Sequence, residues 1–248
     1  MTDLHTHILY GLDDGSDNLE MSIKMLEMAK KNGTNNIVFT PHCNIPNGYI
    51  NYMNDVIIGR FEKLKKISKE REIGVNLYLG MEVYASNDVD RLIMDGAVIT
   101  LNNSRYMLIE FPFDAEPLWV SHILWKVQCL GVIPLLAHPE RYPYVQNFPY
   151  MVYDWVESGC LLQINRGSII GRFGEVARDI AVMFMRDNLV SAVASDAHKP
   201  YKRVPVLNDA YDWVSRNFSE QYAKKIFVDK PTLILKNKPL PPPRRIQF

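Results

Sequence analysis

Short runs of β-branched and other apolar residues alternate along this chain with stretches whose apolar residues recur at helical spacing. This alternation is typical of a parallel sheet, in which each helix returns the chain to the start of the next strand. Seven predicted strands in about 230 residues fit a closed (β/α) barrel better than an open doubly wound sheet, although periodicity alone does not decide between them. The predicted strands span 3–8, 36–40, 75–83, 106–111, 132–137, 161–164 and 190–194. The predicted helices lie between 17 and 33 and over 54–71, 117–130, 150–158, 175–187 and 207–218.

The composition disfavours several classes of function. Lysine plus arginine and aspartate plus glutamate number 28 each, so no net charge favours a nucleic-acid partner or an anionic membrane. The longest apolar stretches, such as 132–137, are far too short to insert across a bilayer, and no signal peptide is expected before the first motif at residue 5. Three widely spaced cysteines argue against a disulfide framework. We therefore expect a cytoplasmic protein.

The chain shows no internal repeat and no linker that would divide it. Residues 1–235 are therefore expected to form a single domain. Residues 236–248 contain Pro239, Pro241, Pro242 and Pro243 and are expected to form an extended tail.

Two histidines separated by one residue, His5 and His7, lie in the first predicted strand. Residues two apart on a strand project from the same face, so these imidazoles could share one metal ion. Further histidines and carboxylates end or follow later strands, and the strand ends of a parallel barrel meet at one rim. The strand-end residues are His5, His7, His42, Glu82, Glu110, His138, Asp196 and His198, and Asp14 adds a carboxylate from the first loop.

Each of these residues has an ordinary structural explanation when it is taken alone. A glutamate at a strand end is usually solvated, and a buried histidine is usually a satisfied core residue. Glu110 is harder to explain, because it lies in the apolar run 108–111, where an unpaired charge is costly. Nine such residues are too many for one ion and indicate a cluster of two or three borderline metals. His122, amid apolar residues of a predicted helix, is expected to serve in packing.

A second motif points to different chemistry. The stretch from Cys160 to Arg166 matches Cys-x5-Arg, the signature of thiol-based tyrosine phosphatases. Such an enzyme needs a loop whose N–H groups curl around the phosphate and lower the thiol pKa. Residues 161–164 are instead an apolar strand without glycine, so we interpret Cys160 as a core residue. Asn165, Arg166 and Ser168 are expected in a loop on the metal rim, where they could line a substrate groove.

The motifs around the candidate ligands resemble those of the polymerase and histidinol phosphatase (PHP) superfamily. They are His5-Thr6-His7, Thr40-Pro41-His42, Gly80-Met81-Glu82, the stretch 137–141 and Ser195-Asp196-Ala197-His198. Within the superfamily, the chain most resembles the bacterial manganese-dependent protein tyrosine phosphatases of capsule and exopolysaccharide loci, through stretches 11–16, 101–106 and 109–111. The resemblance extends to about Pro231.

This resemblance implies a distorted (β/α)7 barrel of the PHP type that holds three divalent metal ions at the C-terminal rim of its strands. Mn²⁺ is the implied metal, with Fe²⁺ and Zn²⁺ as alternatives. Many PHP enzymes have a histidine where this chain has Glu110, and the tyrosine phosphatase subgroup has the glutamate. The implied ligands are His5, His7, Glu82 and Asp196 for the first metal, a bridging Glu82 with Glu110 and His138 for the second, and Asp14, His42 and His198 for the third.

Such a cluster suits the hydrolysis of phosphate monoesters. Metal ions can make hydroxide available near neutral pH and can hold phosphate oxygens. Arg141, which closely follows His138, and Arg203, five residues beyond His198, are placed to reach the same rim. A guanidinium binds phosphate at two points, so we expect both arginines to be catalytic phosphate-binding residues rather than surface ion pairs. A phenol leaves readily, because its pKa is about 10.

We therefore predict a metal-dependent protein tyrosine phosphatase, a phosphoric monoester hydrolase. Its expected substrate is a phosphotyrosine protein, the tail of a bacterial tyrosine kinase that regulates capsular or exopolysaccharide synthesis. One alternative is a small-molecule PHP phosphoesterase, such as a histidinol phosphatase or a sugar-phosphate hydrolase. Another is a nuclease or proofreading module, which the neutral charge disfavours.

Overall fold

A computed structural model describes residues 1–241 of the protein. The predicted tail falls partly on residues 242–248, which lie outside the described part. The strands are β1 (Thr2–Asp3), β2 (Asn36–Phe39), β3 (His42–Cys43), β4 (Asn76–Leu79), β5 (Glu82–Tyr84), β6 (Tyr106–Glu110), β7 (Ile133–Ala137), β8 (Leu161–Asn165) and β9 (Val190–Ala194). The longer helices are α1 (Leu19–Lys31), α2 (Asp55–Glu70), α4 (Pro117–Cys129), α8 (Glu175–Arg186) and α9 (Asn208–Asn217).

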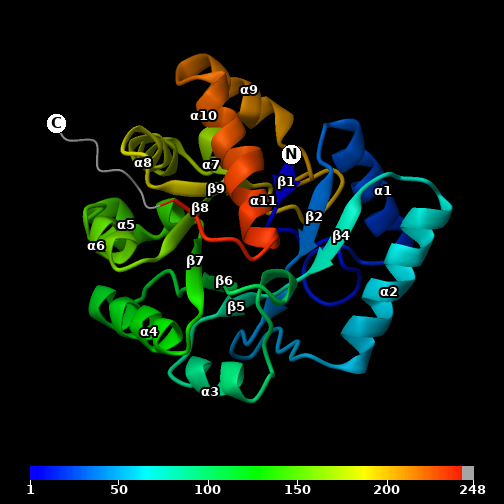
Figure 1. Cartoon of the computed structure of the whole chain (residues 1–248), viewed down its shortest axis with the longest axis horizontal. Helices are drawn as coiled ribbons and strands as arrows, with labels where there is room; N and C mark the ends of the chain where they lie inside the picture. The colour runs from blue at the N-terminus through cyan, green and yellow to red at the C-terminus, as the bar shows by residue number, and fades with distance from the viewer. Residues whose placement is uncertain (242–248) are drawn as a thin grey trace.

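Shorter helical segments complete the fold (Figure 1). They are α3 (Val89–Met94), η1 (Leu101–Asn103), η2 (Pro139–Arg141), α5 (Pro143–Asn147), α6 (Met151–Glu157), α7 (Arg166–Ile169), α10 (Glu220–Lys224), η3 (Lys225–Asp229) and α11 (Lys230–Leu235). Among the described residues, no helix has the length and apolar character needed to cross a membrane.

The strands of the described residues form seven parallel segments around a distorted barrel. β2 and β3 are successive parts of one segment, and β4 and β5 are successive parts of the next. Pairing follows the orders β1-β2-β4 and β3-β5-β6-β7-β8-β9. The first and last segments meet where Thr6 pairs with Ala197, and the N–H of His7 donates to the carbonyl of Ala197 at 2.8 Å. The predicted α/β barrel of parallel strands is therefore confirmed.

Two predicted strands are interrupted. The predicted strand 75–83 divides at Gly80 and Met81 into β4, which pairs with β2, and β5, which pairs with β3 and β6. Gly80 lies close to Leu101 of η1, and a Cβ atom there would lie 3.2 Å from Cα of Leu101, a tight contact. The predicted strand 3–8 pairs regularly only at β1 and again at Thr6.

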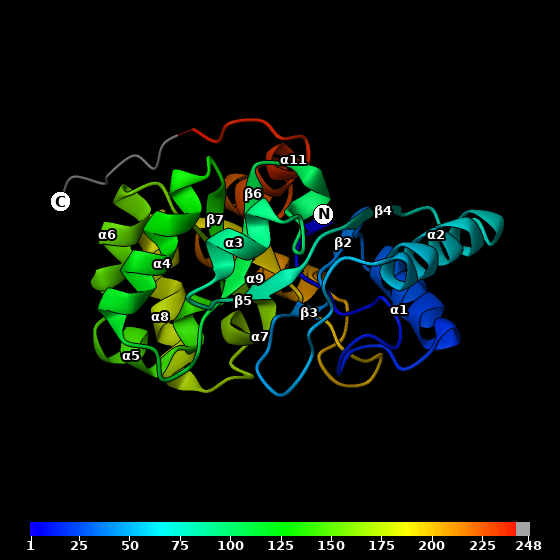
Figure 2. The same cartoon turned by 90° about the horizontal axis from the view of Figure 1, so that it is seen from below.

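Helices cover the barrel on its outside. Figure 2 shows the strands between α4, α5, α6 and α8 on one side and α1 and α2 on the other. The end of the barrel opposite the metal residues is closed by α11, whose Ile234 packs in one buried cluster with Leu4, Tyr106 and Leu135. This closure leaves the carboxyl ends of the strands as the rim at which side chains can meet a ligand.

Candidate metal centre

The structure brings the nine selected side chains together at the carboxyl ends of the strands. They form four overlapping groups, and within each group one ligand atom from every residue lies within 4.8 Å of the others. The groups are His5, His7 and Asp196; His5, Glu82 and His138; His42, Glu82 and Glu110; and His7, Asp14, His42 and His198. Residues from six of the seven barrel segments, together with the first loop, thus converge on one place.

The two histidines of the first segment face each other through their Nε2 atoms, which are 3.2 Å apart. The other ring nitrogen of each has an oxygen partner. Nδ1 of His5 donates to Oε1 of Gln163 at 2.8 Å, and Nδ1 of His7 donates to Oδ2 of Asp13 at 2.7 Å. With hydrogens on both Nδ1 atoms, two Nε2 lone pairs point at each other, an arrangement that suits a cation between them.

Glu82 lies at the centre of the cluster and is fully buried. Its Oε1 atom is 3.0 Å from Nε2 of His5 and 3.3 Å from Nε2 of His138. Its Oε2 atom is 3.3 Å from Nε2 of His7 and 2.9 Å from Nδ1 of His42. Burial favours the neutral acid, but the surrounding imidazoles hold the pKa of Glu82 well below its usual range. The carboxylate therefore contacts four imidazoles and can bridge two ions.

The other carboxylates differ in their exposure. Glu110 is buried, 3.5 Å from Nε2 of His138 and 3.8 Å from Nδ1 of His42. Burial and the neighbouring Glu82 carboxylate raise the pKa of Glu110 to about 8. Two adjacent buried carboxylates are poorly compatible without a cation. Asp14 is 51% exposed and contacts His42 and His198, so it marks the side of the cluster that is open to solvent.

Several buried atoms of the cluster have no hydrogen-bond partner among the described residues. They are Nδ1 of His42, Oε2 of Glu82, Oδ1 of Asp196 and Nε2 of His198. Nδ1 of His42 and Oε2 of Glu82 are close, but they do not form a hydrogen bond with each other. Buried polar atoms rarely remain unpaired, and a mixed set of imidazoles and carboxylates suits borderline divalent metals. The residues present therefore fit metal ions.

The backbone at the rim is strained. His138, Asp196 and Arg203 adopt positive φ angles of 37°, 51° and 56°, in the left-handed region that non-glycine residues rarely occupy. Such strain persists where surrounding contacts hold it, and it concentrates at functional sites. Here it directs two candidate ligands and a candidate phosphate-binding arginine toward the cluster.

Both predicted arginines reach the rim, where they meet Asp196. Nη1 of Arg141 lies 3.5 Å from Oδ2 of Asp196, and Nη2 of Arg203 forms an ion pair with the same oxygen. Burial lowers the pKa of Arg203, but the nearby Asp196 carboxylate raises this pKa above its ordinary value. The Arg141 guanidinium lies over the rings of Phe113 and Phe173, 5.3 and 4.4 Å from their centroids. Two fixed cations thus border the candidate metal site.

Sequence reasoning missed the residues that orient the candidate ligands. Asp13 is adjacent to Asp14, and the loop sequence gave no sign that it would face His7. Asn165, Arg166 and Ser168 were expected in a loop on the metal rim, but Asn165 ends β8, Arg166 and Ser168 lie in α7, and all three are buried. The amide of Asn165 donates to Oδ2 of Asp196 at 2.7 Å. The expectation of a loop was therefore wrong, because β8 extends to Asn165, whose amide contacts the cluster.

The Cys-x5-Arg stretch does not form a phosphate loop. Cys160 is buried, and burial raises the pKa of its thiol to about 12. Arg166 begins α7 after the five residues of β8, so it lies six residues beyond Cys160, or about 20 Å at 3.3 Å per residue. Its guanidinium binds the carboxylate of Asp209 at 2.8 and 2.5 Å. The interpretation of Cys160 as a core residue is confirmed.

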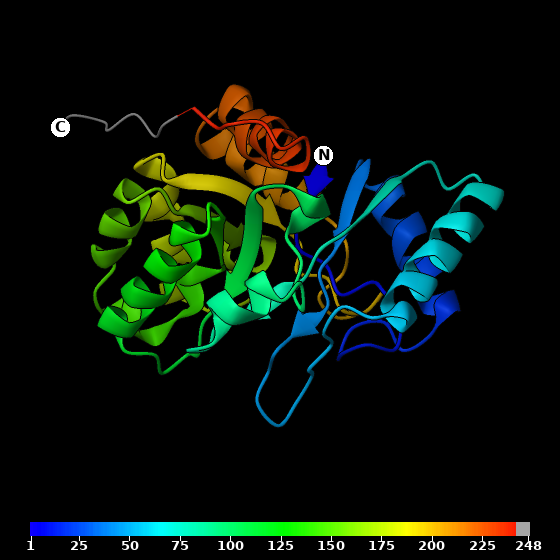
Figure 3. The ribbon, with the colours of Figure 1, turned by 60° about the horizontal axis from the view of Figure 1, so that its bottom comes forward.

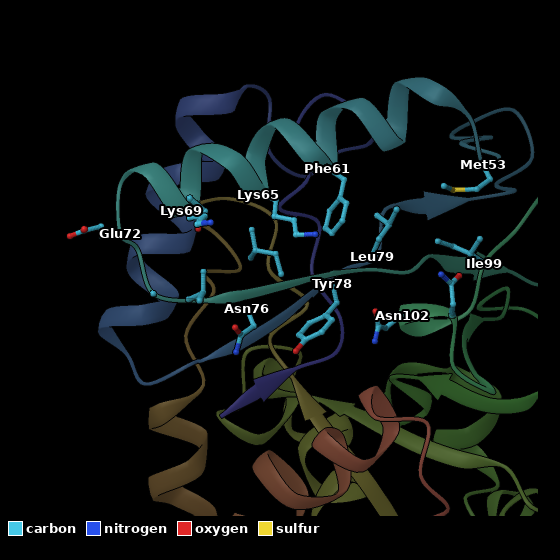
Figure 4. A pocket seen from close by; sticks show the side chains of 15 residues that line it. Met53, Phe61, Lys65, Lys69, Glu72, Asn76, Tyr78, Leu79, Ile99 and Asn102 are labelled. Carbon is cyan, nitrogen blue, oxygen red and sulfur yellow. The ribbon is translucent and has the colours of Figure 1, made fainter.

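Two further features lie away from the cluster. His122 was expected to pack inside, but it is exposed and its ring stacks on Trp125, because Ile123, Leu124 and Val127 occupy the buried face of α4. A groove of about 900 Å³ follows the unpaired edge of β4 beneath α2, and Figure 4 shows Lys65 and Tyr78 in its lining. None of the nine candidate ligands lines this groove.

Comparison with known proteins gives consistent matches. A family model described as capsular polysaccharide synthesis, CpsB/CapC, matches residues 1–236. The tyrosine-protein phosphatase YwqE of Bacillus subtilis is 34% identical over 80% of this chain and 77% of its own. The tyrosine-protein phosphatase CpsB of Streptococcus agalactiae is 32% identical over 96% of this chain and 99% of its own. A crystal structure superposes on this chain over the full length of both chains, with a TM-score of 0.90 at 30% identity. It comes from work on YwqE of Bacillus subtilis and CpsB of Streptococcus pneumoniae, which are described as unique metal-dependent tyrosine phosphatases.

Proposed function

The chain belongs to the CpsB/CapC family of capsular polysaccharide synthesis, and from this premise we propose how its residues act as a metal-dependent tyrosine-protein phosphatase. The activity itself follows from family membership and from the close structural match to metal-dependent tyrosine phosphatases. The proposal concerns the ligands, the number and identity of the metals, the phosphate-binding residues and the protein substrate. We assign the catalytic unit to residues 1–235.

Three divalent ions would occupy the cluster, and Mn²⁺ is the metal we propose for all three. His5, His7, Glu82 and Asp196 would hold the first, Glu82, Glu110 and His138 the second, and Asp14, His42 and His198 the third. The contacts of Glu82 with four imidazoles support this assignment most directly. When bound, the metals supply Lewis acidity for the attacking water and positive charge for the phosphate oxygens.

The side chains around the cluster position the phosphate. Arg141 and Arg203 both lie beside the same oxygen of Asp196, so their guanidinium groups can bind phosphoryl oxygens next to it. Charge spread over these oxygens in the transition state strengthens the contacts, which is how such residues accelerate the reaction. Because a phenol with a pKa of about 10 leaves readily, no dedicated general acid is needed for a tyrosine ester.

A phosphotyrosine protein is the substrate we propose, specifically the tail of a bacterial tyrosine kinase that regulates polysaccharide synthesis. The half-exposed Asp14 side of the cluster supports a protein substrate, because an accessible rim admits a polypeptide. We propose the cytoplasm as the location, supported by the free state of Cys43, Cys129 and Cys160.

Substrate profiling of the Mn²⁺-loaded protein tests this function. We expect rapid phosphate release from phosphotyrosine peptides, slow release from histidinol phosphate and no cleavage of single-stranded DNA. EDTA should abolish the release, and Mn²⁺ should restore it. Faster turnover of histidinol phosphate than of every phosphotyrosine peptide would instead favour the small-molecule phosphoesterase.

A further inference from the structure

Two partly exposed aromatic rings each lie beside one of the candidate metal ligands. Tyr49 is 38% exposed, and its ring is parallel to that of His42 with 6.1 Å between the centroids. Phe113 is 41% exposed, and its ring centroid is 6.4 Å from that of His138. Glu110 contacts both of these histidines. The two rings therefore flank the part of the cluster formed by His42, Glu110 and His138.

The loop that carries Tyr49 projects from the rim, as Figure 3 shows for the segment between β3 and α2. The base of the loop is fixed by Asn44. Its backbone N–H donates to the carbonyl of Ile50 at 2.9 Å, and its side-chain amide donates to the carbonyl of Tyr84 at 2.9 Å. Asn51 also donates to the carbonyl of His42 at 2.8 Å. These contacts hold Tyr49 and the exposed Ile50 in defined positions at the base of the loop, beside the candidate metal residues.

Phe113 is fixed by contacts of its own. Its ring meets that of Tyr142 edge to face, with centroids 5.4 Å apart, and the Arg141 guanidinium lies over it at 5.3 Å. Tyr142 is fully buried and anchored, because its hydroxyl donates to the carbonyl of Ala137 at 2.8 Å. These contacts hold Phe113 in place and leave part of its surface open to solvent.

A phosphate group bound at the cluster must direct its ester group outward, past these rings. We propose that Tyr49 and Phe113 are specificity-determining residues whose rings form two walls that bind the phenyl ring of phosphotyrosine. This inference rests on the proposed phosphatase function. Aromatic pairs favour edge-to-face and offset-stacked contacts, which an aryl ester can make and an alkyl ester cannot. The walls would select the aryl ester without contributing to phosphate binding.

The test separates ring binding from phosphate binding in the full, Mn²⁺-loaded protein. Calorimetry would measure the dissociation constant of a peptide that carries phosphonomethyl-phenylalanine, a stable analogue of phosphotyrosine, and that of inorganic phosphate. We expect Phe113→Leu and Tyr49→Ala each to weaken peptide binding about fivefold, the effect of losing one aromatic pair. Phosphate binding should change less than twofold. Tyr49→Phe keeps the ring and should bind the peptide like the wild type.

Trp125→Leu is the matched control, because Trp125 is an aromatic residue that is 60% exposed on α4, outside the cluster. Metal analysis of each variant checks that the metal content is unchanged, so that a loss of peptide affinity is not caused by a loss of metal at His42 or His138. Wild-type peptide affinity in the Phe113→Leu, Tyr49→Ala double variant would overturn the inference. An equal loss of phosphate affinity would also overturn it, because the rings would then act through Arg141 or His42. If the wild type released no phosphate from phosphotyrosine peptides, the proposed function would fail as well.

Discussion

Asp13 accepts a hydrogen bond from Nδ1 of His7 at 2.7 Å, and the same carboxylate oxygen accepts the backbone N–H of His42 at 2.9 Å. Although Asp13 is buried, the imidazole of His7 lowers its pKa, so Asp13 carries a charge at neutral pH. One carboxylate therefore fixes the tautomer of one candidate ligand and the position of another. Residues of this kind strengthen metal binding without touching the metal.

Replacing Asp13 should weaken metal binding although Asp13 is not a ligand. We expect Asp13→Ala to lower the affinity for Mn²⁺ by about 10- to 100-fold, since loss of such a partner has this effect in other metal sites. Competition with a fluorescent chelator measures this affinity. Asp95→Ala, at an exposed position after α3, is the control. Unchanged affinity in Asp13→Ala would show that the His7 contact does not tune the site.

The two arginines should differ in their effects. Arg141→Ala should lower kcat/KM on a phosphotyrosine peptide at least tenfold, because a charge-assisted hydrogen bond contributes about 1.5–3 kcal/mol. Its metal content should stay unchanged, since Arg141 is 3.5 Å from Asp196 and still partly exposed. Arg141→Lys should restore only part of the activity, because an ammonium cannot make the planar two-point contact.

Arg203→Ala should lower kcat/KM as well, but it also removes the ion-pair partner of the fully buried Asp196. We therefore expect a measurable loss of bound metal in this variant, together with the kinetic loss. Metal analysis and steady-state kinetics on the same preparations distinguish the two arginines. Near-wild-type kinetics in Arg141→Ala would refute its contact with phosphate.

The thiol of Cys160 should be dispensable. Its pKa, raised by burial to about 12, leaves it protonated at neutral pH, so it cannot act as a nucleophile. Cys160→Ala should hydrolyse p-nitrophenyl phosphate within about twofold of the wild-type rate. The substitution removes a small buried group, so we expect it to lower the melting temperature but not the activity. Inactivity of a folded, metal-loaded Cys160→Ala protein would contradict this assignment.

Much of the candidate site could be predicted because its signal is local. A histidine or carboxylate at a strand end is visible in the sequence, and a parallel barrel brings strand ends together whatever their separation along the chain. The close approach of Leu101 to Gly80, where the strand divides, was not predictable, because the two residues meet only in the folded protein.

Residues whose role depends on a distant partner escaped prediction for the same reason. Gln163 and Asn165 lie in an apolar strand, and nothing in their neighbours shows that they face His5 and Asp196. His122 was misplaced because the flanking apolar residues suggested burial, whereas its own position falls on the solvent side of α4. Sequence alone therefore identified candidate ligands better than the residues that orient them.

Lys230 should give the free energy of unfolding a specific pH dependence. This buried amine donates to the carbonyl of Val190 at 2.7 Å, and burial, with the nearby charge of Lys225, lowers its pKa to about 8. The unfolded chain keeps this proton up to a pH of about 10.4. Between these values the unfolded state binds more protons, so the contribution of Lys230 to stability rises with pH.

As the pH rises from 7.5 to 10, we expect the free energy of unfolding of the wild type to increase by up to about 2 kcal/mol relative to that of Lys230→Met. Urea unfolding of both proteins after metal removal measures the difference. Because both proteins contain the same tyrosines, the contribution of tyrosine titration cancels in this difference. Lys66→Met, at an exposed position of α2, should show no such trend. A pH-independent difference between the wild type and Lys230→Met would mean that the buried amine titrates normally.

Metal titration with simultaneous activity measurement tests the central claim most directly. Metal-free protein receives Mn²⁺ in steps, and native mass spectrometry counts bound ions while phosphate release from a phosphotyrosine peptide is recorded. We predict no hydrolysis without metal, about three ions per chain at full activity, and a loss of more than one ion in Glu82→Ala, which removes the bridging carboxylate. Hydrolysis by the metal-free protein, or full metal occupancy in Glu82→Ala, would contradict the account.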